Sequence, residues 1–144
     1  MNRVARVVFD TSTLVGAMLQ VGSVPHRALE LALASTQLCA SPATLRELER
    51  VITRRKFDRY QAPDIRRGFL AVMRANSRLF DVSASDESMV EPPCRDPQDN
   101  KFLALVRGCH ADVLVSSDAD LLAMHPWQGV RILTAAAFLE LLGA

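Results

Sequence analysis

Six acidic residues at the expected ends of strands and helices have the type and placement needed to bind a metal ion. They are Asp10, Glu47, Asp96, Asp99, Asp118 and Asp120. Asp10 and Asp118 close the segments 6–10 and 113–118, each of which begins with an apolar run typical of a buried parallel strand. Functional groups in open α/β sheets gather beyond the carboxyl ends of the strands, so we expect these two carboxylates to face each other. Carboxylates held this close repel one another unless a cation lies between them, which indicates a divalent metal site.

Asp99 is expected to point toward the protein core from the start of a helix. Phe102, Leu103 and Val106 follow it by three, four and seven positions, which places all four side chains on one helix face. An ionised carboxylate on that face requires a partner, because burying it alone is costly. The structural alternative is an aspartate in the first turn that is stabilised by the helix dipole.

The other polar candidates each have a structural explanation beside the functional one. Asp96 is better explained as a helix N-cap, with metal ligation as the alternative. For Asp120, a turn residue that bonds its own backbone and a metal ligand are equally good explanations. Glu47 lies off the apolar stripe of its helix, where a solvated acid is also expected. Ser12 could point into the crevice or be an ordinary first-turn serine. The joint set of carboxylates suits Mg²⁺, which prefers oxygen ligands, better than zinc, which prefers histidine and cysteine.

Length and cysteine content indicate a single reduced domain. A chain of 144 residues can form one domain with a substantial core, and we expect that domain to span residues 1–144. No apolar stretch approaches the roughly 20 residues needed to cross a bilayer, and no separate signal region is visible. Cys39, Cys94 and Cys109 lack the spacing of a metal site or a disulfide framework. We therefore expect a cytoplasmic protein with no membrane contact, in which Cys94 is an exposed loop thiol.

Charge is polarised along the chain although the net charge is only +1. Residues 46–67 contain eight basic and four acidic side chains, whereas residues 81–99 contain six acids and one arginine. The densest basic cluster is Arg54, Arg55, Lys56 and Arg59. It could bind RNA phosphates, but cations at the end of a helix are also favoured by the helix dipole.

Strand and helix patterns alternate along the chain, which predicts an α/β fold with five parallel strands. The expected strands are 6–10, 37–40, 79–82, 112–115 and 130–133. The expected helices are 12–19, 25–35, 42–52, 64–76 and 98–109, followed by a short turn near Leu121 and a closing helix. Residues 83–97 are expected to form a loop, because three prolines there exclude regular pairing.

Four segments, taken in order, resemble the PIN-domain ribonucleases. They are residues 7–15 (VVFDTSTLV), 42–48 (PATLREL), 95–103 (RDPQDNKFL) and 111–122 (ADVLVSSDADLL). More narrowly, the chain is similar to the PIN-family toxins of bacterial toxin–antitoxin pairs, related to the VapC type. The resemblance spans nearly the whole chain.

The resemblance implies an endoribonuclease dependent on Mg²⁺ or Mn²⁺, with a three-layer α/β/α fold and a five-stranded parallel sheet in the order 3-2-1-4-5. It places the four catalytic and metal-binding acids on Asp10, Glu47, Asp99 and Asp118. Ser116 and Ser12 take the positions of the family's supporting polar residues. RNA is the implied substrate, and a cognate antitoxin and a second copy of the chain are the implied protein partners. The expected products have 5'-phosphate and 3'-hydroxyl ends.

Two other functions remain open at this point. Residues 9–15 also look like the first motif of haloacid-dehalogenase-type phosphatases, in which the aspartate is a nucleophile. Ser12 counts against that family, which has a second acid at this position. A non-catalytic PIN-fold module that binds RNA or protein is the other alternative, and the complete set of acids argues against it.

Overall fold

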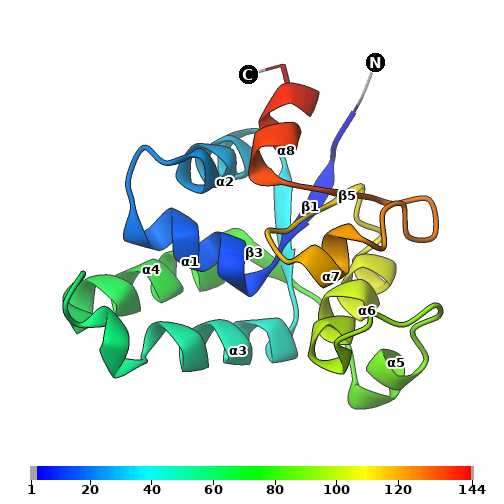
Figure 1. Ribbon diagram of the computed structural model, residues 1–144, viewed down its shortest axis with the longest axis horizontal. Coiled ribbons are helices and arrows are strands. Elements are labelled where there is room, and N and C mark those ends of the chain that lie inside the picture. The colour runs from blue at the N-terminus through cyan, green and yellow to red at the C-terminus, as the bar shows by residue number, and fades with distance from the viewer. Residues whose placement is uncertain (1–2, 144) are drawn as a thin grey trace.

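Five short parallel strands form the centre of the fold in a computed structural model that describes residues 3–143 (Figure 1). The strands are β1 (Arg6–Phe9), β2 (Gln37–Ala40), β3 (Ser77–Leu79), β4 (Val113–Val115) and β5 (Arg131–Leu133). Their order in the sheet is β3-β2-β1-β4-β5. The expected α/β class, strand number and strand order are confirmed.

The central strand β1 is apolar on both sides because helices cover both faces of the sheet. Val7 and Phe9 point into one core cluster and Val8 into the other, and none of the three is more than 3% exposed. Val7 lies opposite Val113 of β4, and the parallel register continues to the carboxyl end of both strands. The residues that follow β1 and β4 therefore emerge side by side.

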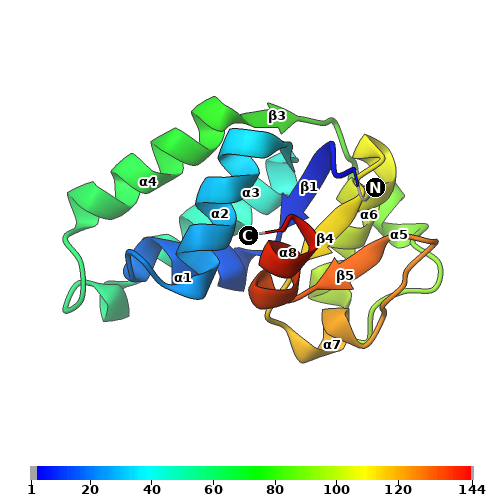
Figure 2. The same ribbon diagram turned by 90° about the horizontal axis from the view of Figure 1, so that it is seen from above.

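Five helices supply the apolar residues that cover one face of the sheet. They are α1 (Thr11–Leu19), α2 (Val24–Ser35), α3 (Pro42–Ile52), α4 (Pro63–Asn76) and α8 (Ala135–Leu141). The ring of Phe138 in α8 meets Phe9 edge to face, with centroids 5.8 Å apart. Figures 1 and 2 both show α4 at one end of the molecule and α5 (Ala84–Ser88) with α6 (Asn100–Cys109) at the other.

The opposite face is covered mainly by α6, which is almost entirely buried. The short helix α7 (Ala119–Leu122) contributes Leu121, and the loop before β5 contributes Trp127, whose ring nitrogen donates to the Pro92 carbonyl at 2.9 Å. The sheet is thus the middle layer of an α/β/α sandwich. None of the helices within residues 3–143 is long and apolar enough to cross a membrane.

Polar caps start the helices next to the strand ends. Asp10 follows β1 and caps α1 by accepting the backbone N–H of Thr13 at 2.9 Å. Ser41 follows β2 and forms a reciprocal capping box with Thr44, and Pro42 occupies the first turn of α3. These caps place the starts of α1 and α3 at the carboxyl edge of the sheet.

Three expectations about the middle of the chain were wrong. Strand β3 is Ser77–Leu79, not 79–82, because Val82 packs against α6 instead of continuing the edge strand. The expected loop 83–97 contains α5, which Ser83 and Asp86 start with a capping box. Cys94 is buried, because it packs into the cluster around α6, and its backbone N–H donates to Asn100 Oδ1 at 2.7 Å.

Candidate metal centre

Asp10 lies at the carboxyl end of β1 and is only 2% exposed. Its backbone N–H donates to the Val115 carbonyl at 3.0 Å, which extends the pairing of β1 with β4 by one residue. Ser116 Oγ donates to Asp10 Oδ2 at 2.5 Å, and Ser12 Oγ donates to Asp10 Oδ1 at 3.3 Å. Burial raises the pKa of Asp10, and these hydrogen bonds oppose the rise by stabilising the carboxylate.

Asp118 approaches the same place from the loop after β4. Its backbone N–H donates to Ser116 Oγ at 2.9 Å, so one buried hydroxyl contacts both Asp10 and the Asp118 backbone. Asp118 also caps α7, because its Oδ1 accepts the backbone N–H of Asp120 at 2.8 Å. Ser116 therefore links the Asp10 carboxylate to the backbone of Asp118.

Asp99 completes the acidic group from the 3₁₀ turn Pro97–Asp99 before α6. It is 9% exposed, and its Oδ2 is buried with no hydrogen-bond partner among residues 3–143. Burial and the adjacent carboxyl of Asp118 raise the pKa of Asp99 to about 8, with further contributions from Asp96 and Asp10. An acceptor oxygen that is buried beside other carboxylates, without a donor, is an electrostatic environment that a cation would relieve.

Glu47 projects from α3 and is bound by protein donors on both oxygens. Thr11 Oγ1 donates to Oε1 at 2.5 Å, and the Lys101 ammonium forms an ion pair with Oε2. Arg50 lies 3.7 Å from the same Oε2, one turn along the helix. Glu47 is therefore already neutralised, in contrast to Asp99.

A cavity of about 550 Å³ joins these acids. It opens between α1, α3 and the loop before α6, and the acids that line it are Asp10, Glu47, Asp96, Asp99 and Asp118. Arg54, Lys56 and Phe57 line it as well, from the segment after α3. The cavity thus has acidic groups beside cationic groups, and it is large enough for part of a nucleotide chain.

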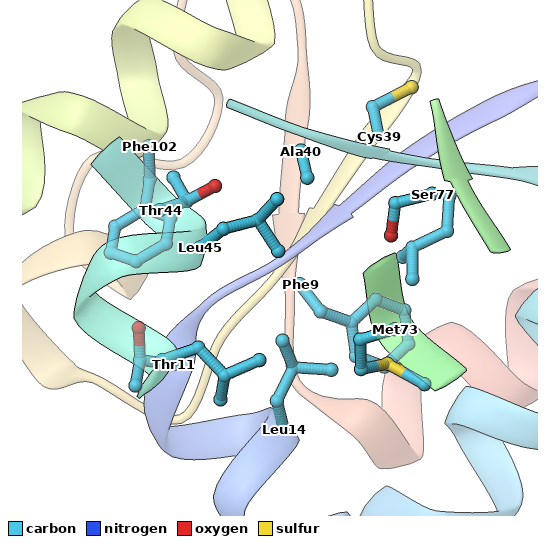
Figure 3. A pocket seen from close by; sticks show the side chains of 12 residues that line it. Phe9, Thr11, Leu14, Cys39, Ala40, Thr44, Leu45, Met73, Ser77 and Phe102 are labelled. Atoms are coloured by element: carbon cyan, nitrogen blue, oxygen red, sulfur yellow. The ribbon is translucent and has the colours of Figure 1, made fainter. Parts of the chain in front are cut away.

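A second hollow between Phe9, Thr44 and Met73 is far smaller, at about 20 Å³ (Figure 3). Its lining is mostly apolar, and Figure 3 shows Leu14 and Leu45 among the side chains around it. This volume holds about one water molecule, so it is not a substrate site.

The amino-acid sequence matches a protein-family model. This family model describes the PIN domain, and it matches residues 6–120, which include all six acidic candidates. The chain belongs to the PIN-domain family. No curated protein matches it in sequence.

Solved structures with the same fold include VapC-type proteins at low sequence identity. VapBC2 from Rickettsia felis, solved with a DNA fragment of its promoter, matches with a TM-score of 0.62 and 14% identity over 88% of this chain and 96% of that chain. PAE2754 from Pyrobaculum aerophilum matches with a TM-score of 0.66 and 12% identity over 99% of this chain and 100% of that chain. VapC20 from Mycobacterium tuberculosis is described as a toxin that cleaves the sarcin-ricin loop. It matches with a TM-score of 0.57 and 17% identity over 87% of this chain and 98% of that chain. In fold, this PIN domain is therefore VapC-like.

The residues of the cavity suit a hard divalent cation. Carboxylate oxygens are the ligands that Mg²⁺ and Mn²⁺ prefer, and no histidine or cysteine lines the cavity. The unpartnered Oδ2 of Asp99 is the observation that fits such an ion most directly. Within residues 3–143, however, no three His, Cys, Asp or Glu side chains are arranged as a ready-made ligand set. Ligation would therefore require the carboxylates to turn toward the ion.

The remaining predicted site residues have identifiable places in the PIN domain. Asp96 caps the turn before α6 through Gln98, as the sequence indicated, and also lines the cavity. Asp120 is not among the residues that line the cavity, although its backbone is bonded to Asp118. Ser12 lines the cavity and contacts Ser117 Oγ at 2.6 Å. Metal binding by any of these residues stays a prediction.

The basic cluster is divided by the structure. Arg54 and Lys56 line the cavity, whereas Arg55 and Arg59 are exposed residues outside its lining. Arg55 and Lys56 belong to the short 3₁₀ helix Arg55–Phe57, which Arg54 precedes and Arg59 follows. RNA binding by all four remains a prediction, and the geometry favours Arg54 and Lys56.

Sequence reasoning missed Thr11 and Lys101, both of which contact Glu47. Thr11 adjoins Asp10 in the first turn of α1, and Lys101 follows Asp99 by two residues at the start of α6. The position of Lys101 was a usable signal, because a lysine in a helix this apolar needs a buried partner of opposite charge. Its partner lies 54 residues away and could not be identified from spacing.

Proposed function

We propose that this PIN domain is an Mg²⁺- or Mn²⁺-dependent endoribonuclease that hydrolyses RNA phosphodiester bonds, and that it is the toxin of a toxin–antitoxin pair. The observation that carries the proposal is the gathering of Asp10, Asp99 and Asp118 at one cavity, with a buried, unpartnered oxygen on Asp99. Membership of the PIN-domain family supports a nuclease. The VapC20 toxin, which cleaves the sarcin-ricin loop, supports RNA as the substrate class.

In this proposal, the three aspartates hold the ion, and Ser116 fixes the orientation of Asp10 through its 2.5 Å hydrogen bond. The ion, when bound, supplies a Lewis acid that makes water a better nucleophile and offsets phosphate charge. Arg54 and Lys56 bind phosphate oxygens of the RNA chain at the cavity wall. Water attacks the phosphorus instead of the ribose 2'-hydroxyl, and the bond to the 3'-oxygen breaks. The products therefore carry 5'-phosphate and 3'-hydroxyl ends.

The two rival functions are less well supported. A haloacid-dehalogenase-type phosphatase would need an unencumbered nucleophile at Asp10, but that carboxylate accepts bonds from Ser116, Ser12 and the Thr13 backbone. The family match also favours a PIN nuclease. A non-catalytic module has no need of an aspartate such as Asp99, whose pKa is raised by burial and by the neighbouring acids.

A cognate antitoxin is the proposed protein partner, and the VapBC2 complex of a similar fold supports it. Exposed apolar side chains at Val21, Ile65 and Val72 line a shallow groove of about 350 Å³, and such surfaces are typical of protein interfaces. We further propose a homodimer acting in the cytoplasm. Light scattering of the purified chain, alone and coexpressed with the product of the neighbouring gene, measures both associations.

RNA cleavage by the purified chain tests the proposed activity. We expect structured RNAs to be cut with Mg²⁺ or Mn²⁺ and to stay intact with a chelator. The variants Asp10→Asn and Asp118→Asn should lose at least about a hundredfold in rate, the usual scale for removing a group that stabilises transition-state charge. Asparagine can still cap a helix, so both variants should remain folded.

The matched control is Asp64→Asn, which makes the same chemical change at a carboxylate that is 88% exposed and pairs with Arg67 on the surface of α4. It should cleave RNA at the wild-type rate. Full activity of both cavity variants, or cleavage that continues in chelator, would contradict the proposal. Hydrolysis of small phosphate esters without RNA cleavage would favour the phosphatase.

A further inference from the structure

Glu47, which lines the cavity, forms a largely buried ion pair with Lys101. Only 15% of the Glu47 side chain and 11% of the Lys101 side chain are exposed. The pair joins α3 to α6, two helices on opposite faces of the sheet. A buried ammonium is stable only beside a negative partner, so Glu47 is the group that keeps Lys101 in place.

Glu47 has no oxygen left without a protein partner. Thr11 donates to Oε1 at 2.5 Å, Lys101 donates to Oε2, and Arg50 stands 3.7 Å from Oε2. Asp99 differs, because its Oδ2 has no partner within the described chain, residues 3–143. The acidic cavity therefore has two parts: an aspartate part that lacks positive charge, and a Glu47 part in which a lysine already supplies it.

A second divalent ion at Glu47 would have to displace the Lys101 ammonium. It would also leave the ammonium, on a side chain that is only 11% exposed, close to a dication. Both changes are unfavourable, because like charges repel most strongly where solvent is excluded.

We propose that the Lys101 ammonium occupies the place of a second divalent cation, so that this site binds one ion, at Asp10, Asp99 and Asp118. Glu47 then acts as the residue that positions Lys101 and is not a ligand of the ion. The inference rests on the proposed function, since it takes for granted that the aspartates bind a divalent cation. It goes further by fixing the number of ions and by assigning a role to Lys101.

Counting Mn²⁺ ions on the full chain tests this inference without measuring activity. Calorimetric titration should give one Mn²⁺ for each wild-type chain, and the electron paramagnetic resonance spectrum of the bound ion should be that of an isolated Mn²⁺. In Lys101→Met, which removes the charge and keeps most of the apolar stem, Glu47 becomes available. We expect this variant to bind two ions, with the altered spectrum of a coupled Mn²⁺ pair.

Three further variants separate charge from structure. Lys101→Arg keeps the positive charge and should bind one ion. The double variant Lys101→Met with Glu47→Gln should also return to one ion, because it removes the second carboxylate. Lys56→Met is the matched control, since it removes one lysine charge from the lining of the cavity, and it should leave the count at one. Circular dichroism verifies the fold of each variant.

The outcomes distinguish the two proposals. Two ions on the wild-type chain would overturn the inference and leave the proposed nuclease standing. A single ion on correctly folded Lys101→Met would overturn the role of Lys101. If Lys101→Met does not fold, the wild-type and Lys101→Arg counts still decide between one ion and two. No Mn²⁺ binding by the wild-type chain would overturn the metal-dependent function and, with it, this inference.

Discussion

Ser116 Oγ donates a 2.5 Å hydrogen bond to Asp10 Oδ2, which connects the carboxyl ends of β4 and β1 through a hydroxyl that is 1% exposed. The same oxygen accepts the backbone N–H of Asp118 at 2.9 Å. Ser116 thus contacts both the Asp10 carboxylate and the Asp118 backbone. Its geometry determines how the acidic cavity is assembled.

Ser116→Ala should lower the free energy of unfolding by about 1–3 kcal/mol, because it leaves a buried carboxylate oxygen of Asp10 and the partly buried N–H of Asp118 without their partner. Urea unfolding measures the loss. Ser117→Ala is the matched control, since the exposed Ser117 hydroxyl contacts only Ser12 Oγ in the bonds described, and it should change stability much less. Equal effects of the two substitutions would contradict the structural role of Ser116.

The pKa of Asp99, raised to about 8 from an ordinary value of 3.8, predicts how stability of the metal-free protein depends on pH. Between these values, the folded state keeps a proton that the unfolded state has lost. Stability should therefore fall as pH rises from about 4 to about 8 and then level off. Asp10, whose pKa is also raised, contributes with the same sign.

Asp99→Asn removes this titration and should make the metal-free protein more stable than the wild type at pH 8 to 9. Melting temperatures in chelator at several pH values measure the difference. Adding Mn²⁺ should raise the melting temperature of the wild type at pH 8 but not that of the variant. A wild type whose stability increases steadily between pH 5 and pH 8 would show that Asp99 is not protonated in the folded state.

Arg54 and Lys56, which line the cavity, should contribute more to RNA binding than Arg55 and Arg59, which do not. Replacing Arg54 and Lys56 with alanine should reduce the affinity for RNA. It should also make the slope of log binding constant against log salt concentration shallower by about 1.4, the amount expected for two lost contacts to single-stranded phosphates. Arg55→Ala with Arg59→Ala removes the same charge outside the cavity lining and should change both quantities less. Fluorescence anisotropy on a catalytically inactive background at several salt concentrations provides the measurement. Indistinguishable slopes for the two double variants would rule out this placement of the RNA.

Arg66 holds the segment that carries these cations. Its guanidinium, 2% exposed, donates to the Ile52 carbonyl at 2.6 Å and to the Arg54 carbonyl at 3.1 Å, and pairs with Asp58. Arg66→Met should cost about 2–4 kcal/mol in the free energy of unfolding, because two carbonyls at the end of α3 lose a charged donor.

Arg67→Met is the comparison for Arg66→Met. Arg67 is 62% exposed, and its pair with Asp64 should be worth less than about 1 kcal/mol. Chemical denaturation of both variants tests the difference. A loss at Arg66 no larger than that at Arg67 would mean that the turn after α3 does not depend on this buried arginine.

The sheet and the aspartates could be predicted because each depends on local sequence. Apolar runs that end in aspartate specify β1 and β4, and a parallel sheet brings their ends together, which is why the shared location of Asp10 and Asp118 could be predicted. The core-facing position of Asp99 could be predicted from its helical spacing to apolar residues. The strand order came from the family resemblance and not from the spacing of residues.

Other features depend on tertiary contacts that spacing does not encode. Lys101 and Glu47 meet across two layers of the fold, and Val82 leaves the expected third strand to pack against α6. Helix α5 is different, since the pattern Ser83–x–x–Asp86 is a capping signal that was visible in the sequence. The prolines of this segment follow α5, so they exclude regular pairing only after the helix.

Anomalous diffraction from crystals of the chain grown with Mn²⁺ tests most directly whether the acidic group is a metal site. We expect a single strong anomalous peak between the carboxylates of Asp10, Asp99 and Asp118, and we expect it to be absent when Asp99→Asn crystals are treated in the same way. The contrary result is a wild-type map with no peak at this cavity, or with its manganese bound elsewhere on the molecule.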